Sequence, residues 1–194
     1  MKQPLIVIGI SGVARSGKDT VANHLVTANG FFRIALADGI RESLNGLDGP
    51  TWQLRKEFDE HEKTARWAMQ TLGGEGRSGL DESAFELWTS LALVKIHYLS
   101  KLHPVPRHKF VIPDVRYDYE PIRLKRVVRQ MGGHYETWKI NRPTSGLTGE
   151  AALHESERGV ERVGADVVIQ NHLDLGYMFG QVDTAVDQFV KACQ

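Results

Sequence analysis

Short apolar runs alternate with amphipathic stretches along most of the chain. Near-continuous apolar runs are typical of strands buried on both faces, and their alternation with helical patterns is typical of parallel βαβ units. Residues 5–10 form such a near-continuous run, and further strands are predicted at residues 31–36, 110–114, 135–140 and 167–169. The pattern therefore predicts an α/β fold with a five-stranded parallel sheet in a single domain.

Three helices are predicted where apolar positions recur at helical spacing on one face. The first starts at about Lys18 and stops at Gly30, the second starts near Pro121 and stops at Gly132, and the third lies near residue 180. Their apolar positions are Val21, Ala22, Leu25 and Val26; Leu124, Val127, Val128 and Met131; and Met178, Val182, Ala185, Val186 and Phe189.

A long helical insertion, at about residues 51–102, separates the second and third predicted strands. Asp81 is a good N-cap for the longest helix of this insertion. The expected apolar stripe of that helix contains Phe85, Trp88, Leu91, Ala92 and Leu99. The expected core of the domain is therefore residues 1–50, 103–140 and 160–194.

The composition excludes several classes of protein. The chain has 194 residues, 24 Lys and Arg against 24 Asp and Glu, and a mean hydropathy of -0.31. No apolar run approaches the roughly 18 residues of a membrane span, and the apolar run after Pro4 is too short for a signal peptide. The lone cysteine, Cys193, excludes a disulfide framework and a cysteine metal site. We therefore expect a cytoplasmic protein without membrane contact.

The charge distribution also bears on partners. Zero net charge argues against a protein that coats nucleic acid, because such proteins are normally basic. One basic run, consisting of Arg123, Lys125, Arg126 and Arg129, lies mostly opposite the apolar stripe of its predicted helix. We interpret this run as a solvated helix face, so no nucleic-acid partner is expected.

The strongest chemical signal is the segment GVARSGKDT at residues 12–20. It follows a buried strand and runs into a helix, which is the context of a P-loop. Glycines let N–H groups point inward, the helix N-terminus adds positive charge, and Lys18 can reach the β- and γ-phosphates of ATP. The expected ATP-binding residues here are Gly12, Ala14, Arg15, Ser16, Gly17, Lys18, Asp19 and Thr20. The alternative, a glycine-rich turn without a ligand, does not explain the lysine and its spacing.

The loop departs from the common ending Gly-Lys-Ser/Thr, in which the hydroxyl binds Mg²⁺. Asp19 follows Lys18, and the hydroxyl comes one residue later at Thr20, about 100° further around the helix. Asp19 could hold the ion through water, or Thr20 could reach it after a local adjustment. The sequence does not decide between them.

A carboxylate ends the third predicted strand. Asp114 is similar to the acidic residue that holds Mg²⁺ in P-loop enzymes, although a strand-end turn residue is the alternative. Arg116 follows two residues later, at the carboxyl edge of the sheet where ligands of open α/β folds bind. This position favours the functional interpretation.

Four blocks of sequence occur in a specific order. They are residues 12–20, 66–73 (RWAMQTLG), 111–116 (VIPDVR), and 154–157 (HESE) before 165–171, with the pair Arg142-Pro143 between the last two blocks. Together they resemble the phage-type deoxynucleoside monophosphate kinases. The P-loop is shared by many enzymes, whereas its combination with Arg-x-x-x-Gln-x-Leu-Gly and Asp-x-Arg is much more specific.

The resemblance implies a three-layer P-loop kinase fold with a helical acceptor-binding insertion and a lid at about residues 141–159. It implies transfer of the γ-phosphoryl group of ATP, with Mg²⁺, to a deoxynucleoside 5′-monophosphate for dNTP synthesis. Such an acceptor already carries about −1.5 to −2 charge near pH 7, so its oxygen needs no strong general base. Positioning and charge neutralisation then suffice. The candidate catalytic residues are Lys18, Arg15, Asp114, Arg116 and Arg142.

The resemblance also supplies an acceptor site. Carried over by position, it consists of Asp38, Arg41, Arg55, Arg66, Gln70, Gly73, Arg77, Trp88 and Arg116. Guanidinium forks suit a bidentate grip on phosphate, and Gln70 could read a base edge. Some of these residues have simpler interpretations: Arg55 and Arg66 as solvated helix residues, Trp88 as core and Asp38 as a helix cap.

The last third of the chain contributes a lid and an expected contact to ATP. Arg142 and Arg158 are candidates for stabilising the transferring phosphoryl group as the lid closes. Asn171, after the last strand, is expected near the adenine of ATP. His154 with Glu155 and Glu157 is expected to act as a lid hinge or cap, because no second histidine lies at zinc-site spacing. The resemblance further implies a homodimer and, for a phage-encoded chain, the host-cell cytoplasm.

Two other functions stay open. One is a P-loop kinase of a different small acceptor, such as dephospho-coenzyme A, phosphomevalonate or a sugar acid. The other is a nucleotide-binding module without transfer activity. The block at residues 66–73 together with Arg55 favours a mononucleotide over a sugar, and the number of arginines favours an enzyme over a module.

Overall fold

The computed structural model describes residues 3–48, 87–143 and 155–194 of the chain. These residues belong to two compact units. The sheet unit consists of Met1–Ile34 with Leu93–Gln194, and the helical unit is Ala35–Ala92.

Five strands and several helices make up the described part of the chain. The strands are β1 (Leu5–Ser11), β2 (Phe32–Arg33), β3 (Lys109–Ile112), β4 (Gly133–Asn141) and β5 (Val167–Gln170). The helices of the sheet unit are α1 (Lys18–Asn29), α6 (Tyr119–Gln130), α8 (Glu155–Arg162) and α9 (Leu175–Ala192), with the π-helical turn η3 (Tyr98–Leu102). The helical unit contains α2 (Ala37–Asp48), and α5 (Leu87–His97) continues from it into the sheet unit.

All five strands form one parallel sheet in the order β2-β3-β1-β4-β5, which confirms the predicted fold class. From β1 the chain runs through α1 to β2, at one edge of the sheet. From β3 it runs through α6 to β4, which lies on the opposite side of β1 from β3. Ligands of open α/β folds bind outside the carboxyl ends of neighbouring strands whose connections diverge in this way. Here the two segments that leave the carboxyl ends of these neighbouring strands are residues 12–20, after β1, and residues 114–116, after β3.

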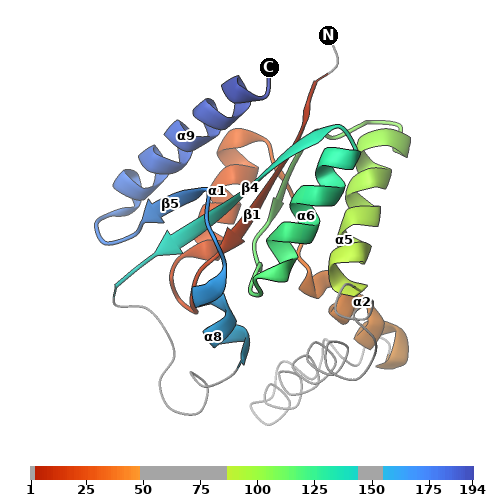
Figure 1. Cartoon of the computed structure of the whole chain (residues 1–194), viewed down its shortest axis with the longest axis horizontal. Helices are drawn as coiled ribbons and strands as arrows, with labels where there is room; N and C mark the ends of the chain where they lie inside the picture. Colours follow the sequence, from red (N-terminus) through yellow and green to blue (C-terminus); the bar gives the residue numbers. More distant parts are fainter. Residues whose placement is uncertain (1–2, 49–86, 144–154) are drawn as a thin grey trace. The chain divides into compact units, whose positions relative to one another are not determined.

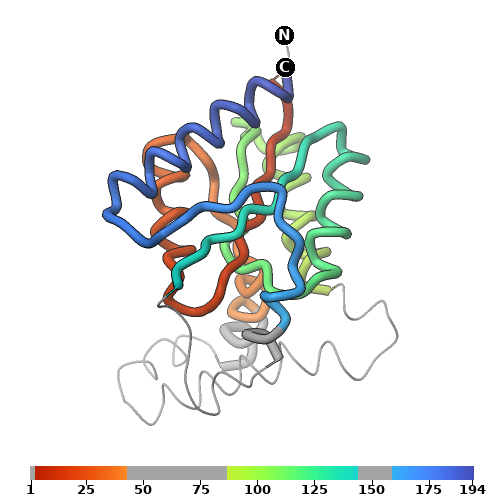
Figure 2. Tube along the Cα trace, turned by 60° about the vertical axis from the view of Figure 1, so that its left-hand side comes forward, coloured from red at the N-terminus to blue at the C-terminus, as the bar shows by residue number. Residues whose placement is uncertain are grey.

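Helices cover both faces of the sheet, so the sheet unit has three layers (Figure 2). Helices α1 and α9 pack against each other on one face, and α6 packs on β4 and β1 (Figure 1). The main core cluster lies between the sheet and the α1–α9 layer and includes Ile8, Leu25 and Trp138, all fully buried. Every residue of β1 is buried, as its continuous apolar run predicts. The core therefore holds the central strand that leads into the candidate site.

The ends of the helices agree with the sequence signals. Helix α1 begins directly after Gly17, and the N–H of Gly30 donates to the carbonyl of Leu25 at its other end. The side chain of Asp174 accepts a hydrogen bond from the N–H of Tyr177 at 2.8 Å and caps α9. Capping satisfies backbone groups that a helix end leaves without partners.

The second predicted strand is shorter than the apolar run at residues 31–36. Only Phe32–Arg33 forms β2, which lies at the edge of the sheet and pairs with β3. After it, the carboxylate of Asp38 accepts the N–H of Ala35 at 2.8 Å, and the N–H of Asp38 donates to the carbonyl of Ala35 at 3.1 Å. This turn uses backbone groups that a longer strand would need.

The predicted apolar stripe of the long insertion helix is partly wrong. Trp88 and Ala92 are buried, but Leu91 is 43% exposed, and Leu93 and Ile96 are buried in its place. Apolar residues occupy several faces of α5, so their spacing does not select the buried face. Asp81 and Phe85 lie outside the described residues.

No helix within the described ranges is long and apolar enough to cross a membrane.

Candidate phosphate-binding site

The loop that joins β1 to α1 has an unusual backbone. Gly17, the N-cap of α1, has φ +103, and a Cβ at this position would lie 2.6 Å from Nδ2 of Asn171. Arg15 has φ +62, the one positive value for a non-glycine residue in the described part of the chain. Left-handed residues among right-handed ones turn successive N–H groups toward one point, which forms an anion-binding concavity at a helix N-terminus.

Lys18 reaches back over this loop. Its Nζ donates to the carbonyl of Val13 at 2.8 Å, and the N–H of Ser16 donates to the same carbonyl at 3.2 Å. An ammonium group has three donors, so Lys18 can keep this contact and still donate to phosphate oxygens. The lysine is thus held over the concavity that the backbone forms.

Two side chains from the carboxyl ends of β4 and β5 bind the outside of the loop. Nδ2 of Asn171 donates to the carbonyl of Ser16 at 2.8 Å, and Nη1 of Arg142 lies 3.4 Å from the carbonyl of Arg15. A loop that turns N–H groups inward must turn carbonyls outward, and these carbonyls need donors. Asn171 and Arg142 supply them.

Two buried hydroxyls lie at the loop. Ser11 ends β1 and Ser16 belongs to the loop, and both residues are 0% exposed. Neither hydroxyl has a hydrogen-bond partner among the residues that the structure describes. A buried polar group without a partner costs about 1–3 kcal/mol. A bound phosphate that accepted a hydrogen bond from one of these hydroxyls would remove that cost and so bind more tightly.

The candidate Mg²⁺ ligands are all oxygen donors, which fits the chemistry of this ion. The side chain of Asp19 is 83% exposed and lies 3.7 Å from Arg33, whereas Thr20 is half-buried. In the described ranges no three His, Cys, Asp or Glu side chains come together as a metal cage. A Mg²⁺ bound mainly by water and substrate phosphates, with one or two protein ligands, is compatible with this donor set.

The turn after β3 carries the second group of candidates. β3 ends at Ile112, so Asp114 lies in the turn beyond the strand rather than at its last residue. The N–H of Val115 donates to the carbonyl of Ile10 at 3.1 Å, which fastens the turn to the end of β1. Asp114 and the loop at residues 12–20 therefore follow two neighbouring strands, β3 and β1, at one edge of the sheet.

A buried carboxylate that the sequence analysis did not single out holds this turn. Glu120, 1% exposed, accepts the N–H groups of Arg116 at 2.7 Å and Tyr117 at 3.0 Å. Gly159 of α8 also packs closely on the turn, since a Cβ at this position would lie 2.8 Å from the carbonyl of Arg116. The available sequence signal was an acidic residue in the first turn of a helix, directly after the candidate Asp114 and Arg116.

The candidate acceptor residues of the helical unit have structural contacts. Asp38, the second residue of α2, accepts the N–H of Ala35 from the preceding turn, and Nη1 of Arg41 donates to its carboxylate at 3.0 Å. These contacts thus join the start of the helix to that turn. The indole of Trp88 is 5% exposed and packs on Gly39, which favours a core role. The remaining candidates, Arg55, Arg66, Gln70, Gly73 and Arg77, lie outside the described residues, as do His154 and the side chains of residues 155–158.

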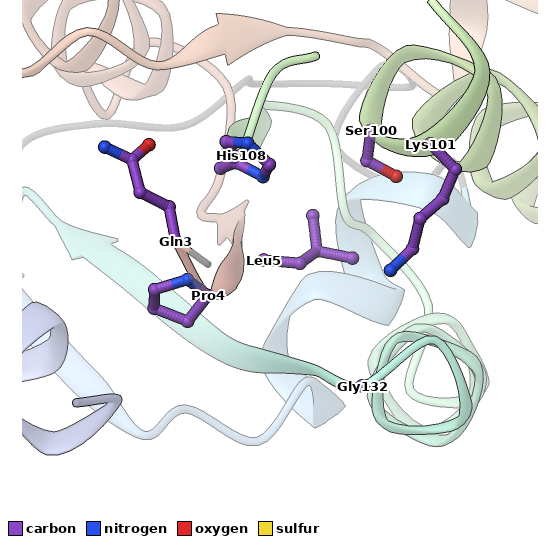
Figure 3. Close-up of a pocket in the computed structure, with 7 residues that line it drawn as sticks. All are labelled: Gln3, Pro4, Leu5, Ser100, Lys101, His108 and Gly132. Carbon is purple, nitrogen blue, oxygen red and sulfur yellow. The ribbon is translucent and has the colours of Figure 1, made fainter. Parts of the chain in front are cut away.

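A pocket lies at Leu5, the first residue of β1 and so at the opposite end of this strand from the loop. Figure 3 shows the residues that line it. The pocket has a volume of about 270 Å³ and is lined by Gln3, Pro4, Leu5, Ser100, Lys101, His108 and Gly132. Because β1 spans seven residues, the pocket and the loop lie roughly 20 Å apart. None of its lining residues belongs to the predicted site.

The sheet order, the loop and the divergent connections define the three-layer α/β fold expected of a P-loop kinase. No protein-family model and no curated protein matches the chain. Solved structures do match, and of the three described next, two are kinases by name.

The matching structures cover nearly the whole chain. A gluconokinase from Sinorhizobium meliloti 1021 has a TM-score of 0.53 at 13% identity, covering 99% of this chain and 97% of its own. A cysteine-to-alanine mutant of the APS kinase CysC from Mycobacterium tuberculosis has a TM-score of 0.51 at 12% identity, covering 96% and 97%. TT1252 from Thermus thermophilus has a TM-score of 0.50 at 18% identity, covering 96% and 98%. At this identity the likeness shows the fold, which agrees with the fold that the resemblance implied.

Proposed function

We propose that this protein transfers the γ-phosphoryl group of ATP to deoxynucleoside 5′-monophosphates. The observation that carries the proposal is the loop after β1, where Lys18 and an anion-binding backbone lie at the divergence point of the sheet. Two buried hydroxyls at the same loop have no partner among the described residues, which supports a phosphate ligand. The sequence blocks that resemble deoxynucleoside monophosphate kinases supply the choice of acceptor.

On the donor side, N–H groups of residues 12–20 would bind the phosphates of ATP, and Lys18 would offset charge on the β- and γ-phosphates. Mg²⁺, held by Asp114 with Asp19 or Thr20, would supply further neutralisation when bound. Arg15, Arg116 and Arg142 are the cations proposed to stabilise the transferring group. Since the acceptor oxygen is already anionic, no side chain has to remove a proton from it.

On the acceptor side, the proposal rests on sequence. Arg41, Arg55, Arg66 and Arg77 would bind the monophosphate, and Gln70 with Gly73 would lie along the base. The described contacts of Asp38 and Trp88 assign them supporting roles, in which Asp38 orients Arg41 and Trp88 packs beneath α2. A dimer of this chain and action in the cytoplasm of a phage-infected cell remain parts of the proposal that the resemblance alone carries.

A second candidate is a kinase of a different small acceptor. One of the matching structures is a gluconokinase, so the same fold serves a protein named for a sugar-acid substrate. The segment at residues 66–73 favours a nucleotide over such a substrate.

The experiment is a panel of acceptors in an ADP-release assay. We expect at least one of the four deoxynucleoside monophosphates to stimulate ADP release well above the ribonucleotides, dephospho-coenzyme A, phosphomevalonate and gluconate. Stimulation by another acceptor alone would establish the second candidate, and no stimulation by any acceptor would favour a binding module.

One variant tests the acceptor residues directly. Arg66→Ala should raise the acceptor KM or lower kcat by about tenfold or more while sparing ATP affinity, because one guanidinium grip is lost. Arg129→Ala, on the exposed face of α6, is the matched control and should leave both constants unchanged. Normal turnover of Arg66→Ala at every acceptor concentration would remove Arg66 from the site.

A further inference from the structure

Asn171 contacts the phosphate loop at a single peptide. Its Nδ2 donates to the carbonyl of Ser16 at 2.8 Å, and a Cβ on Gly17 would lie 2.6 Å from the same nitrogen. The carbonyl of Ser16 and the N–H of Gly17 belong to one planar trans peptide and therefore point in opposite directions. A donor that fixes this carbonyl outward thus aims the N–H of Gly17 into the loop.

Asn171 is itself held at the carboxyl edge of the sheet. Its N–H donates to the carbonyl of Asn141 at 2.8 Å, which continues the β4–β5 ladder one residue beyond its last pair. Nδ2 of Asn141 also donates to Oε1 of Gln170 at 2.9 Å, so the two strand ends are joined by side chains as well. The position of Asn171 is therefore set by the strand ends and not by the loop alone.

A glutamine of α9 fixes the end of β5. The carboxamide of Gln181 donates to the carbonyl of Gln170 at 2.9 Å and accepts the N–H of Gln170 at 3.0 Å. It pairs with both backbone groups of this residue, as a further strand would at the open edge of β5. The rigid α9 helix thereby supports the residue before Asn171.

We propose that Asn171 is a positioning residue that holds the phosphate loop in the shape that binds a triphosphate. The inference rests on the proposed function only in that the loop binds the phosphates of ATP. It differs from the expectation that Asn171 lies at the adenine. Without the carboxamide, the peptide of Ser16 and Gly17 loses its outward anchor, so its N–H is free to turn away from the phosphates.

The test compares ATP with inorganic tripolyphosphate, which has the phosphates but no base. Asn171→Leu keeps the shape of the side chain and adds no charge, but it cannot donate to Ser16. Calorimetric titration without any acceptor should show that both affinities fall by about tenfold and by the same factor. Asn23→Leu, the same change at an exposed position of α1, should leave both affinities unchanged. Asn171→Ala is the second variant if the leucine does not fold.

The outcomes separate the possible roles of Asn171. A loss for ATP with unchanged tripolyphosphate binding would place Asn171 at the nucleoside and overturn the inference. Unchanged binding of both ligands, with only a lower melting temperature, would show a structural role and also overturn it. If the wild-type chain bound neither ligand, this inference and the proposed function would both fall. If it bound both but phosphorylated no deoxynucleoside monophosphate, only the proposed function would fall, because the titration contains no acceptor.

Discussion

Two connections leave neighbouring strands at the same edge of the sheet and are built in different ways. The loop after β1 has two glycines with positive φ and a left-handed Arg15, and side chains bind its carbonyls from outside. The turn after β3 has no residue with positive φ from Pro113 to Asp118, and the buried carboxylate of Glu120 binds its N–H groups. One connection presents backbone donors, and the other presents the side chains of Asp114 and Arg116.

On the proposed function, this difference assigns nucleotide binding to the loop and phosphoryl transfer to the turn. In the loop, binding depends on backbone shape, so a single added Cβ can destroy it. In the turn, Glu120 holds the backbone that carries the proposed catalytic side chains, so changes there should act on transfer more than on nucleotide binding. Variants can therefore break the two regions separately.

The largest effect is expected at Lys18, whose Nζ reaches back over the loop to the carbonyl of Val13. Lys18→Ala should lower kcat by about a thousandfold, because the loop loses the cation that offsets charge during transfer. Steady-state kinetics measures this change. Lys101→Ala, at the opposite end of β1, is the control and should be as active as wild type. A kcat for Lys18→Ala within tenfold of wild type would show that the loop does not serve phosphoryl transfer.

A glycine pair tests whether the loop acts through its backbone. Gly17→Ala should weaken ATP binding by about a hundredfold, because it adds strain at φ +103 and a Cβ 2.6 Å from Asn171. Gly30→Ala also places alanine at a positive φ, but nothing lies within 4 Å of its Cβ. It should cost about 1 kcal/mol of stability and leave ATP binding intact. Equal ATP affinities in the two variants, measured by titration calorimetry, would contradict the account of the loop.

The turn after β3 should respond in the opposite way. Glu120→Ala leaves two N–H groups without their acceptor, so the free energy of unfolding should fall by about 2–3 kcal/mol. Because Asp114 and Arg116 would no longer be held in place, kcat should fall roughly tenfold, whereas ATP affinity should change little. Urea unfolding, kinetics and titration measure the three quantities. Glu120→Gln keeps an acceptor oxygen, so its stability and kcat should lie between those of wild type and Glu120→Ala. If Glu120→Ala lost more ATP affinity than kcat, the turn would serve nucleotide binding, contrary to this account.

The smallest effect is expected at the far end of α1. His24 and Asn29 both contact Asp183 of α9, at 2.8 and 2.9 Å, and the hydrogen bond from Asn29 is the main cause that lowers the pKa of Asp183. A lowered carboxyl pKa stabilises the folded state above the ordinary value near 4, and this stabilisation disappears as the pH falls through the lowered pKa. Because the side chain of Asp183 is 52% exposed, the amount is under about 1 kcal/mol.

The corresponding variant separates the helix from the loop that precedes it. Asp183→Asn should be slightly less stable than wild type in denaturant titrations at pH 7, with the difference shrinking toward pH 3. Its ATP affinity should equal that of wild type. A loss of ATP affinity would mean that contacts at the end of α1, and not only those at the loop, set the shape of the binding site.

Much of the fold was predictable because local signals agreed with tertiary packing. The apolar run of β1, the glycines around α1 and the stripe of α9 each had one interpretation, and the structure confirms them. β2 and α5 were predicted less well. β2 is shorter than predicted because the side chain of Asp38 takes up the N–H of Ala35. In α5, apolar residues occupy several faces, so the sequence does not show which face is buried.

The candidate site was predictable where chemistry is contiguous in sequence. The nine residues from Gly12 to Thr20 carry their own context, so the loop was found directly. Contacts between distant residues were not accessible: the bond from Asn171 to Ser16 spans 155 positions, and no local pattern encodes it. Glu120 was missed because an acidic residue in a first helical turn is ordinary, and only its burial shows what it holds.

The most direct measurement of the central claim follows the phosphoryl group itself. ATP labelled in the γ-phosphate is incubated with Mg²⁺, a deoxynucleoside monophosphate and the wild-type chain, with Lys18→Ala in parallel, and the products are separated. The account predicts label in the β-phosphate of the deoxynucleoside diphosphate, lost in the variant. Label that stays in ATP, or that appears only as inorganic phosphate at equal rates with both chains, would contradict it.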